Sequence, residues 1–251
     1  MTVVCKNCGV HFKGNYCYNC SQKAATDRLK VSNVLHELWH NFTHTDRSAL
    51  GLLAALFKNP GRVIQDYIEG KRKKYFNPYT FFLVSGAIVI FLTGKVFKYE
   101  DALYEFHNEF GQAVNQFYTI ILLCSMPLMA LILKWVFANK KYNYAEWISF
   151  LIFSFCIVNV VQVVIQLLYF IFIKWHSSLL GYTEATSYLI ILWVTISFIK
   201  PRSIVAWLQC IAAMLLIFVC VEVLAKGIYL WWFGVPVEML IKSAKSMFGI
   251  S

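Results

Sequence analysis

Four cysteines near the start of the chain have the spacing of metal ligands. They form two C-x-x-C pairs, Cys5 with Cys8 and Cys17 with Cys20, and eight residues separate the pairs. A C-x-x-C turn lets two thiolates converge on one ion, and Zn²⁺ prefers four such ligands in a tetrahedron. Gly9 follows the first pair and can adopt the positive φ that such a turn tends to need. We therefore expect a structural zinc site in which sulfur fills all four positions.

Two other arrangements of these cysteines stay open. A pair of disulfides would require an oxidising compartment, and a redox dithiol would need only one of the two C-x-x-C pairs. The remaining cysteines all fall in apolar runs, where a free thiol behaves as a small hydrophobic group. We assign no chemistry to these four, which are Cys124, Cys156, Cys210 and Cys220.

Three histidines form a row at helical spacing. His36, His40 and His44 are four residues apart, so they share one side of a helix. An H-x-x-x-H pair can hold a metal, which makes the row a candidate second metal or proton site. The simpler interpretation is the polar flank of an amphipathic helix over 31–42, which would lie in the membrane interface or pack on the helical bundle.

A polar stripe occurs inside a long apolar run. Asn159, Gln162 and Gln166 are spaced by three and four residues, which places them on one helical face. Polar groups inside a membrane helix most often form hydrogen bonds to neighbouring helices. They can also line a pathway for an ion or a small polar solute, and both interpretations stay open.

A basic cluster precedes the first apolar run. A short helix is expected to begin at Pro60 and to end at Gly70. The cluster follows at once, and each cation is worth about 1 kcal/mol against an anionic leaflet. We expect a topology anchor or a lipid-headgroup site, and no nucleic-acid binding, because no reading helix accompanies the charge. The cluster consists of Lys71, Arg72, Lys73 and Lys74.

The composition indicates a membrane protein. The chain is 59% hydrophobic and only 14% charged, with a mean hydropathy of +0.58, whereas soluble domains carry about 25% charged residues. A membrane helix needs about 20 apolar residues. Five runs meet or approach this length, namely 79–97, 117–137, 147–173, 186–199 and 204–224. A further stretch, 228–241, is broken at Gly234 and Pro236 and is expected to be interfacial or re-entrant.

The expected fold is therefore an all-α polytopic membrane protein with a small N-terminal zinc ribbon. We divide it into a cytoplasmic zinc ribbon (1–25), amphipathic juxtamembrane helices with the basic anchor (26–77) and a transmembrane helical bundle (78–251). Residues 1–10 show no apolar signal segment, so the first span is expected to direct insertion.

The charge distribution predicts the orientation. Residues 1–78 carry twelve Lys and Arg against five Asp and Glu, and positive loops stay in the cytoplasm. The N-terminus is therefore expected in the cytoplasm and, with five spans, the C-terminus in the periplasm. Because the cytosol keeps thiols reduced, this orientation favours zinc over disulfides.

Three motifs resemble an uncharacterised family of bacterial membrane proteins, mostly from Bacteroidota, known as domain of unknown function 3667. The first is C-x-x-C-G…Y-C-x-x-C-x-Q, from Cys5 to Gln22, and the second runs from His40 to Arg47. The third and most specific is P-G-x-V-I-x-x-Y-x-x-G-K-R-x-x-Y-x-x-P, over 60–78. The resemblance implies a zinc-ribbon head, several spans and an inner-membrane location, and it implies no established activity.

A weaker match is Tyr144-x-Glu146, which opens the third expected span. The family pattern continues there with His, whereas this chain has Trp147. We expect Glu146 to lie at the cytoplasmic edge of the membrane beside Lys141.

Three functions from different classes fit the sequence. The favoured one is a non-enzymatic scaffold or accessory subunit of a membrane complex, in contact with lipids and other proteins, with its oligomeric state left open. The alternatives are a channel or transporter that uses the polar stripe, and an enzyme on lipid-linked substrates that uses the histidine row and Glu37. No H-E-x-x-H or G-x-S-x-G motif supports the enzyme.

Overall fold

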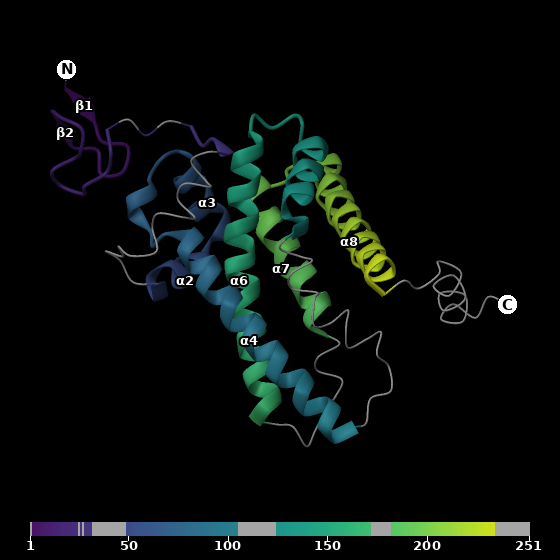
Figure 1. Ribbon diagram of the computed structural model, residues 1–251. Helices are drawn as coiled ribbons and strands as arrows, with labels where there is room; N and C mark the ends of the chain where they lie inside the picture. Colours follow the sequence, from purple (N-terminus) through teal and green to yellow (C-terminus); the bar gives the residue numbers. More distant parts are fainter. Residues whose placement is uncertain are drawn as a thin grey trace.

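A computed structural model of the chain describes residues 2–24, 26, 28–31, 49–104, 124–171 and 182–233. These residues form a small two-stranded head and a body of helices (Figure 1). The elements are β1 (Val3–Val4), β2 (His11–Phe12), α2 (Ala49–Lys58), α3 (Pro60–Ile68), the 3₁₀ turn η1 (Arg72–Lys74), α4 (Pro78–Tyr104), a helix over Cys124–Val136, α6 (Tyr144–Ile171), α7 (Tyr182–Ile199) and α8 (Ile204–Phe233).

The head is held by its cysteine turns and by one short hairpin. β1 and β2 pair antiparallel, with Val3 opposite Phe12 and Val4 opposite His11. Its apolar centre consists of three buried side chains, those of Cys5, Phe12 and Cys17. So small a core cannot stabilise a fold by itself.

The helix α3 begins and ends as the sequence predicts. The side chain of Asn59 caps its start by accepting from the Arg62 N–H, and Pro60 occupies the first turn. At its end Gly70 has a φ of +101°. The N–H of Gly70 donates to the carbonyl of Tyr67, and the N–H of Lys71 donates to that of Asp66. These two bonds are the Schellman pattern that stops a helix at glycine.

The helix α6 is the centre of the body. Its first turn is closed reciprocally, because the Asn143 side chain accepts from the Glu146 N–H while the Glu146 carboxylate accepts from the Asn143 N–H. The helix α4 packs along α6, α7 packs against α6 and α3, and α8 lies against α7 (Figure 1). Most of α6 is buried, whereas α8 exposes most of its apolar side chains.

Two described helices are long and apolar enough to cross a membrane. They are Tyr144–Leu168, with a mean hydropathy of 2.5, and Ile204–Leu224, with a mean hydropathy of 2.7. The apolar parts of the other described helices are shorter, at Ala49–Lys58, Pro78–Gly94, Cys124–Val136 and Ala185–Ile199. Length and composition thus mark two candidate spans, and the predicted total of five is not reached by this criterion.

Several helix bounds differ from the sequence prediction, and one helix was not predicted. The helix α6 begins at Tyr144 and α7 at Tyr182, earlier than the expected spans. The helix α4 continues past residue 97 to Tyr104, and α8 runs unbroken to Phe233, although a separate stretch was expected from 228. Lone Gly227 does not stop α8, because a glycine inside a helix costs only about 1 kcal/mol. The helix α2 was not predicted. It buries the side chains of Leu52 and Leu56, which are four residues apart and share one helical face.

Several predictions fall outside the described residues. These are the histidine row His36, His40 and His44, the helix over 31–42 beyond Val31, the first part of the expected span 117–137, the last two residues of the expected span 147–173, and the break at Gly234 and Pro236.

Candidate metal site and its seat on the helical body

The four predicted cysteines converge on one point. Their Sγ atoms all lie within 4.8 Å of one another. The Sγ atoms of Cys5 and Cys20 are 3.5 Å apart, and those of Cys8 and Cys17 are 3.6 Å apart. A tetrahedral ion with metal–sulfur distances of about 2.3 Å places its ligands about 3.8 Å apart. The donor set therefore fits a metal ion that takes four thiolates.

The two halves of the site have the same backbone. In the first turn the N–H of Gly9 donates to the Cys5 carbonyl at 2.9 Å, and in the second the N–H of Ser21 donates to the Cys17 carbonyl at 2.8 Å. Gly9 has a φ of +76° and Ser21 a φ of +57°. Both turns thus need a residue in the left-handed region, and only the first has glycine there.

The environments of the cysteines favour different protonation states. Burial raises the pKa of Cys5 to about 11. The backbone N–H of Val10, assisted by hydrogen bonds from other groups that include Asn19, lowers the pKa of Cys8 to about 6. A metal must displace the protons of its thiol ligands, so Cys8 releases its proton to an ion more readily than Cys5.

The head is attached to the body through Gln22. Its amide nitrogen donates to the Gly70 carbonyl at 2.6 Å and to the Thr26 hydroxyl at 2.9 Å. Its amide oxygen accepts from the Lys73 N–H at 3.1 Å. Gln22 is the last residue of the cysteine motif, Lys73 belongs to the basic cluster, and Gly70 directly precedes that cluster. One side chain therefore joins two separate motifs.

Gly70 allows the head to approach closely. A Cβ atom at Gly70 would lie 3.1 Å from Cδ of Lys6 and 3.3 Å from Cγ2 of Thr26. Lys6 in turn donates to the Thr26 carbonyl at 2.6 Å. The glycine therefore serves both the positive φ of the helix end and the contact with the head.

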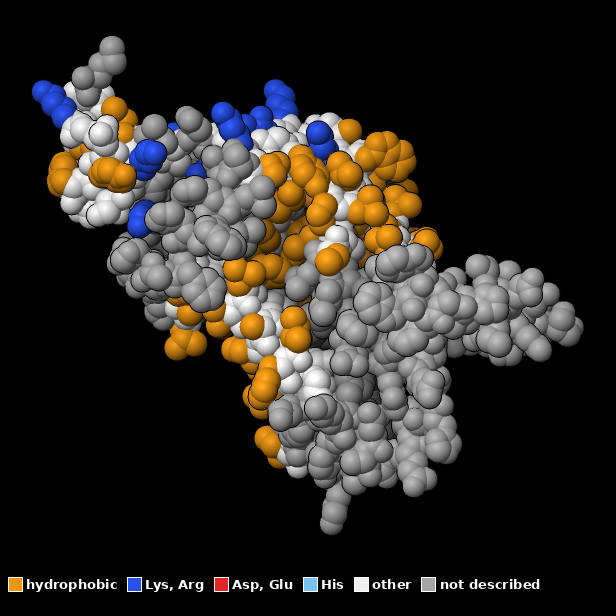
Figure 2. Space-filling view, viewed as in Figure 1, with side chains coloured by type: hydrophobic (Ala, Val, Ile, Leu, Met, Phe, Trp, Pro, Cys, Tyr) orange, Lys and Arg blue, Asp and Glu red, His pale blue; other side chains and the backbone are white. Residues whose placement is uncertain are grey.

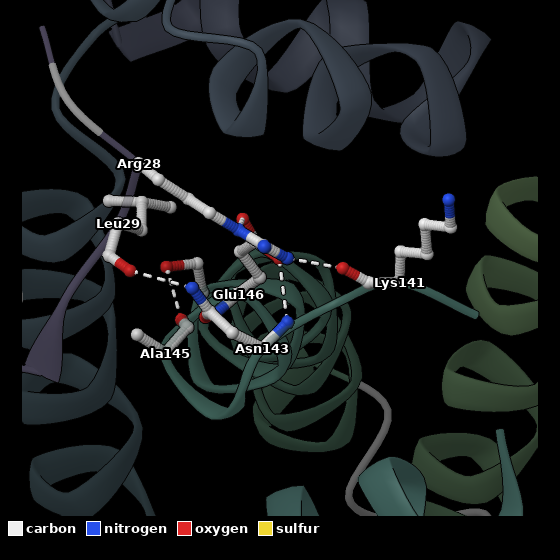
Figure 3. Close-up of polar contacts among 7 residues, drawn as sticks. Arg28, Leu29, Lys141, Asn143, Ala145 and Glu146 are labelled. Atoms are coloured by element: carbon white, nitrogen blue, oxygen red, sulfur yellow. Dashed lines mark hydrogen bonds and ion pairs between the residues drawn. The ribbon is translucent and has the colours of Figure 1, made fainter. Parts of the chain in front are cut away.

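A second attachment follows the head in the chain. Nε and Nη2 of Arg28 contact the two carboxylate oxygens of Glu146 at 2.7 and 2.8 Å, and Nη2 also donates to the Lys141 carbonyl (Figure 3). Asn143 donates from its side chain to the Leu29 carbonyl at 2.8 Å. Glu146 therefore pairs with Arg28, whereas the sequence predicted a position beside Lys141, which supplies its carbonyl to the same arginine.

The basic cluster is organised around a buried carboxylate. Asp66 is 6% exposed and accepts from Lys71 at 2.8 Å, from Lys74 at 2.5 Å and from the Tyr75 hydroxyl at 3.0 Å. Burial alone would raise the pKa of Asp66, but these hydrogen bonds outweigh it and lower the pKa to about 2. Two of the four predicted lipid-contacting cations thus point to Asp66. Arg72 lies over the Tyr67 ring, 5.8 Å from its centre.

The predicted polar stripe forms bonds between helices. Asn159 donates to the Ser85 hydroxyl of α4 at 3.0 Å, and Gln166 donates to the Thr93 hydroxyl of α4 at 2.7 Å. Gln162 donates to the Ser187 hydroxyl of α7 at 3.0 Å. The stripe therefore joins α6 to both of its neighbours.

Trp147 belongs to an aromatic cluster. Its ring stacks on Phe137 at 5.5 Å and meets Phe150 edge-on at 5.5 Å, and it also contacts Phe198 at 5.9 Å. The side chain is 1% exposed. It packs the start of α6 against the end of α7.

The predicted site residues do not include Gln22, Arg28 and Asn143, which attach the head and the chain that follows it to the body. They also do not include Asp66, which binds the cations of the basic cluster. Two signals were present in the sequence. Gln22 is part of the cysteine motif, and Asn143 stands three residues before Glu146, the spacing of a capping box. The pairing of Arg28 with Glu146 spans 118 positions, and no local pattern could reveal it.

The comparison with protein families agrees with the third motif. Residues 53–90 match the sequence model of a family described as "Protein of unknown function (DUF3667)". This segment includes Gly61, Asp66, Gly70 and the whole basic cluster. No curated protein and no solved structure matches the chain.

Proposed function

We propose that this protein is a non-enzymatic scaffold or accessory subunit of a membrane complex in the cytoplasmic membrane of a bacterium. A zinc-stapled cytoplasmic head would present a docking surface to a partner, and five helices would span the bilayer. The observation that carries the proposal is the double attachment of the head, through Gln22 to the Gly70–Lys73 segment and through Arg28 to Glu146. A head fixed in this way has a defined position relative to the bundle.

The distribution of side chains supports the orientation. Lys and Arg gather along the end of the molecule where the head lies, and hydrophobic side chains cover the helical body below them (Figure 2). Such an arrangement suits a cytoplasmic end and a lipid-facing belt. The exposed apolar side chains of α8 include Ile204, Val205, Leu208, Leu215 and Val223, each at least 59% exposed.

Zinc is the metal that we propose for the head. Four cysteines in a tetrahedral array are a donor set that structural zinc sites use. Bound zinc would supply the folding energy that three buried side chains cannot. The basic segment would rest at the anionic leaflet, with Lys71 and Lys74 oriented by Asp66.

The solute pathway has weaker support. The hypothesis of a pathway depends on the polar stripe Asn159, Gln162 and Gln166 of α6. Each of these three side-chain amides donates a hydrogen bond to a neighbouring helix. Interhelical bonding therefore accounts for these residues without a channel or transporter.

The scaffold is tested by isolating the full chain in native-membrane nanodiscs through a C-terminal tag. Tyr16 and Tyr18 are 62% and 79% exposed on the head. We expect a stoichiometric partner with the wild type and its loss with Tyr16→Ser/Tyr18→Ser, at unchanged zinc content. The matched control is Leu50→Ser, an exposed residue of α2, which should retain the partner. A chain that is monodisperse and alone in every preparation would contradict the proposal.

A further inference from the structure

Two of the three side-chain hydrogen bonds of Gln22 join the head to the body. The side chain is 4% exposed. Its amide nitrogen donates to Gly70 and Thr26, and its oxygen accepts from the backbone of Lys73. A buried amide group that lacks a hydrogen-bond partner destabilises the fold by more than one such hydrogen bond stabilises it. The hydrogen bonds of Gln22 are therefore expected to form together or to be lost together.

The position of Gln22 depends on the second cysteine turn. The N–H of Cys17 donates to the Gln22 carbonyl at 2.9 Å, and Ser21, directly before Gln22, is held at a φ of +57°. This backbone is the one that aims Cys17 and Cys20 at a common point. Without an ion, the turn keeps only the backbone pairing around it, which includes the bond from the Ala24 N–H to the Asn15 carbonyl. The strands of the head are two residues long and its buried centre is three side chains.

We propose that metal in the head acts as a conformational latch on the basic segment Lys71–Lys74. With metal bound, Gln22 holds the head against the Gly70–Lys73 backbone. When the metal is removed, the cysteine turn relaxes, Gln22 withdraws, and the segment becomes able to open. The proposal rests on the metal site proposed above and adds a consequence of its occupancy.

A second attachment remains when Gln22 is released. Arg28 lies six residues beyond Gln22 and is held by Glu146, which belongs to the body and not to the head. A relaxed head therefore stays tethered beside its seat and can return when metal binds again.

Limited trypsin digestion of the full chain in phosphatidylcholine nanodiscs tests the latch, because the segment consists of trypsin sites. Cleavage follows the population of the opened segment, and losing the two hydrogen bonds from Gln22 to Gly70 and Lys73 should raise that population at least about fivefold. We expect this increase at residues 71–74 when a chelator removes the metal. Cleavage after Arg202, an exposed site in the loop between α7 and α8, serves as the internal control and should not change.

Gln22→Ala separates the latch from the fold of the head. It should keep the metal content and the wild-type cleavage rates after Lys6 and Lys13, yet raise cleavage at 71–74 as much as the chelator does. A chain that binds metal but shows the same cleavage at 71–74 with and without chelator would overturn the latch alone. A chain that binds no metal would overturn the latch together with the metal site.

Discussion

At the scale of the residue, the basic end of the molecule is organised by two buried carboxylates. The Asp66 carboxylate accepts hydrogen bonds from Lys71, Lys74 and Tyr75. The Glu146 carboxylate accepts hydrogen bonds from Arg28 and from the Asn143 N–H. A buried carboxylate is tolerated only when it is paired and hydrogen-bonded. These residues therefore fix the positions of the cations around them.

The pairing of Asp66 predicts an acid-dependent stability. Its pKa is about 2 in the folded chain against an ordinary 3.8, so the folded state binds fewer protons than the unfolded state. The stabilisation, of order 2 kcal/mol, is fully present above pH 3.8 and is lost as the pH falls towards 2. Thermal unfolding between pH 2 and 6 should show this loss in the wild type. Asp66→Asn should be less stable at pH 7 and should lack this component; an equal acid response in both chains would contradict the assignment.

The ion pair of Arg28 predicts an asymmetric mutational effect. Arg28→Ala leaves the Glu146 side chain, 3% exposed, without its charged partner, and we expect a loss of about 1–3 kcal/mol. The matched control is Arg202→Ala at an exposed loop position, with an expected change below about 0.5 kcal/mol. Both are measured by thermal unfolding in detergent. Equal effects would show that the bidentate contact contributes nothing.

At the scale of the element, α3 and α7 approach each other closely at Gly61. Gly61 donates from its N–H to the Ser197 hydroxyl at 3.1 Å, and Gln65 donates to the Phe198 carbonyl at 3.2 Å. A Cβ atom at Gly61 would lie 2.1 Å from the Ser197 backbone oxygen. Glycine is required here by the approach of another backbone and not by an unusual φ.

This contact predicts that Gly61→Ala separates the two helices. Because the clash is with backbone, no side-chain movement relieves it, and we expect a loss of about 2 kcal/mol or more. Gly94→Ala is the matched control in α4, where an added Cβ meets nothing within 4 Å. That change should stabilise by up to about 1 kcal/mol, because alanine favours the helix. Thermal unfolding of both variants decides the point, and a neutral Gly61→Ala would refute the close approach.

The elements also show what the sequence could and could not predict. The cysteine cluster, the helix from Pro60 to its end before Gly70, and the helical face of Asn159, Gln162 and Gln166 follow from local spacing. The helix α2 was missed because its apolar run is only ten residues long, too short to be recognised as a span. The attachments through Gln22 and Arg28 join distant parts of the chain, and local patterns carry no information about such pairs.

At the scale of the whole molecule, the head, the basic segment and the start of α6 form one connected end. Gln22 joins the head to the basic segment. Arg28, in the chain that follows the head, joins it to α6. The apolar body extends away from this end (Figure 1). We therefore propose a head that is stapled by metal and mounted on a helical body that spans the membrane.

The zinc content of the membrane-embedded chain tests this description most directly. The full chain is taken from carbonate-washed membranes, extracted in detergent and analysed for metals beside Cys17→Ser. We predict about one zinc ion per wild-type chain and none in the variant, with both chains in the washed membranes. Release of the wild type into the carbonate wash, or a membrane-bound wild type without metal, would contradict the account.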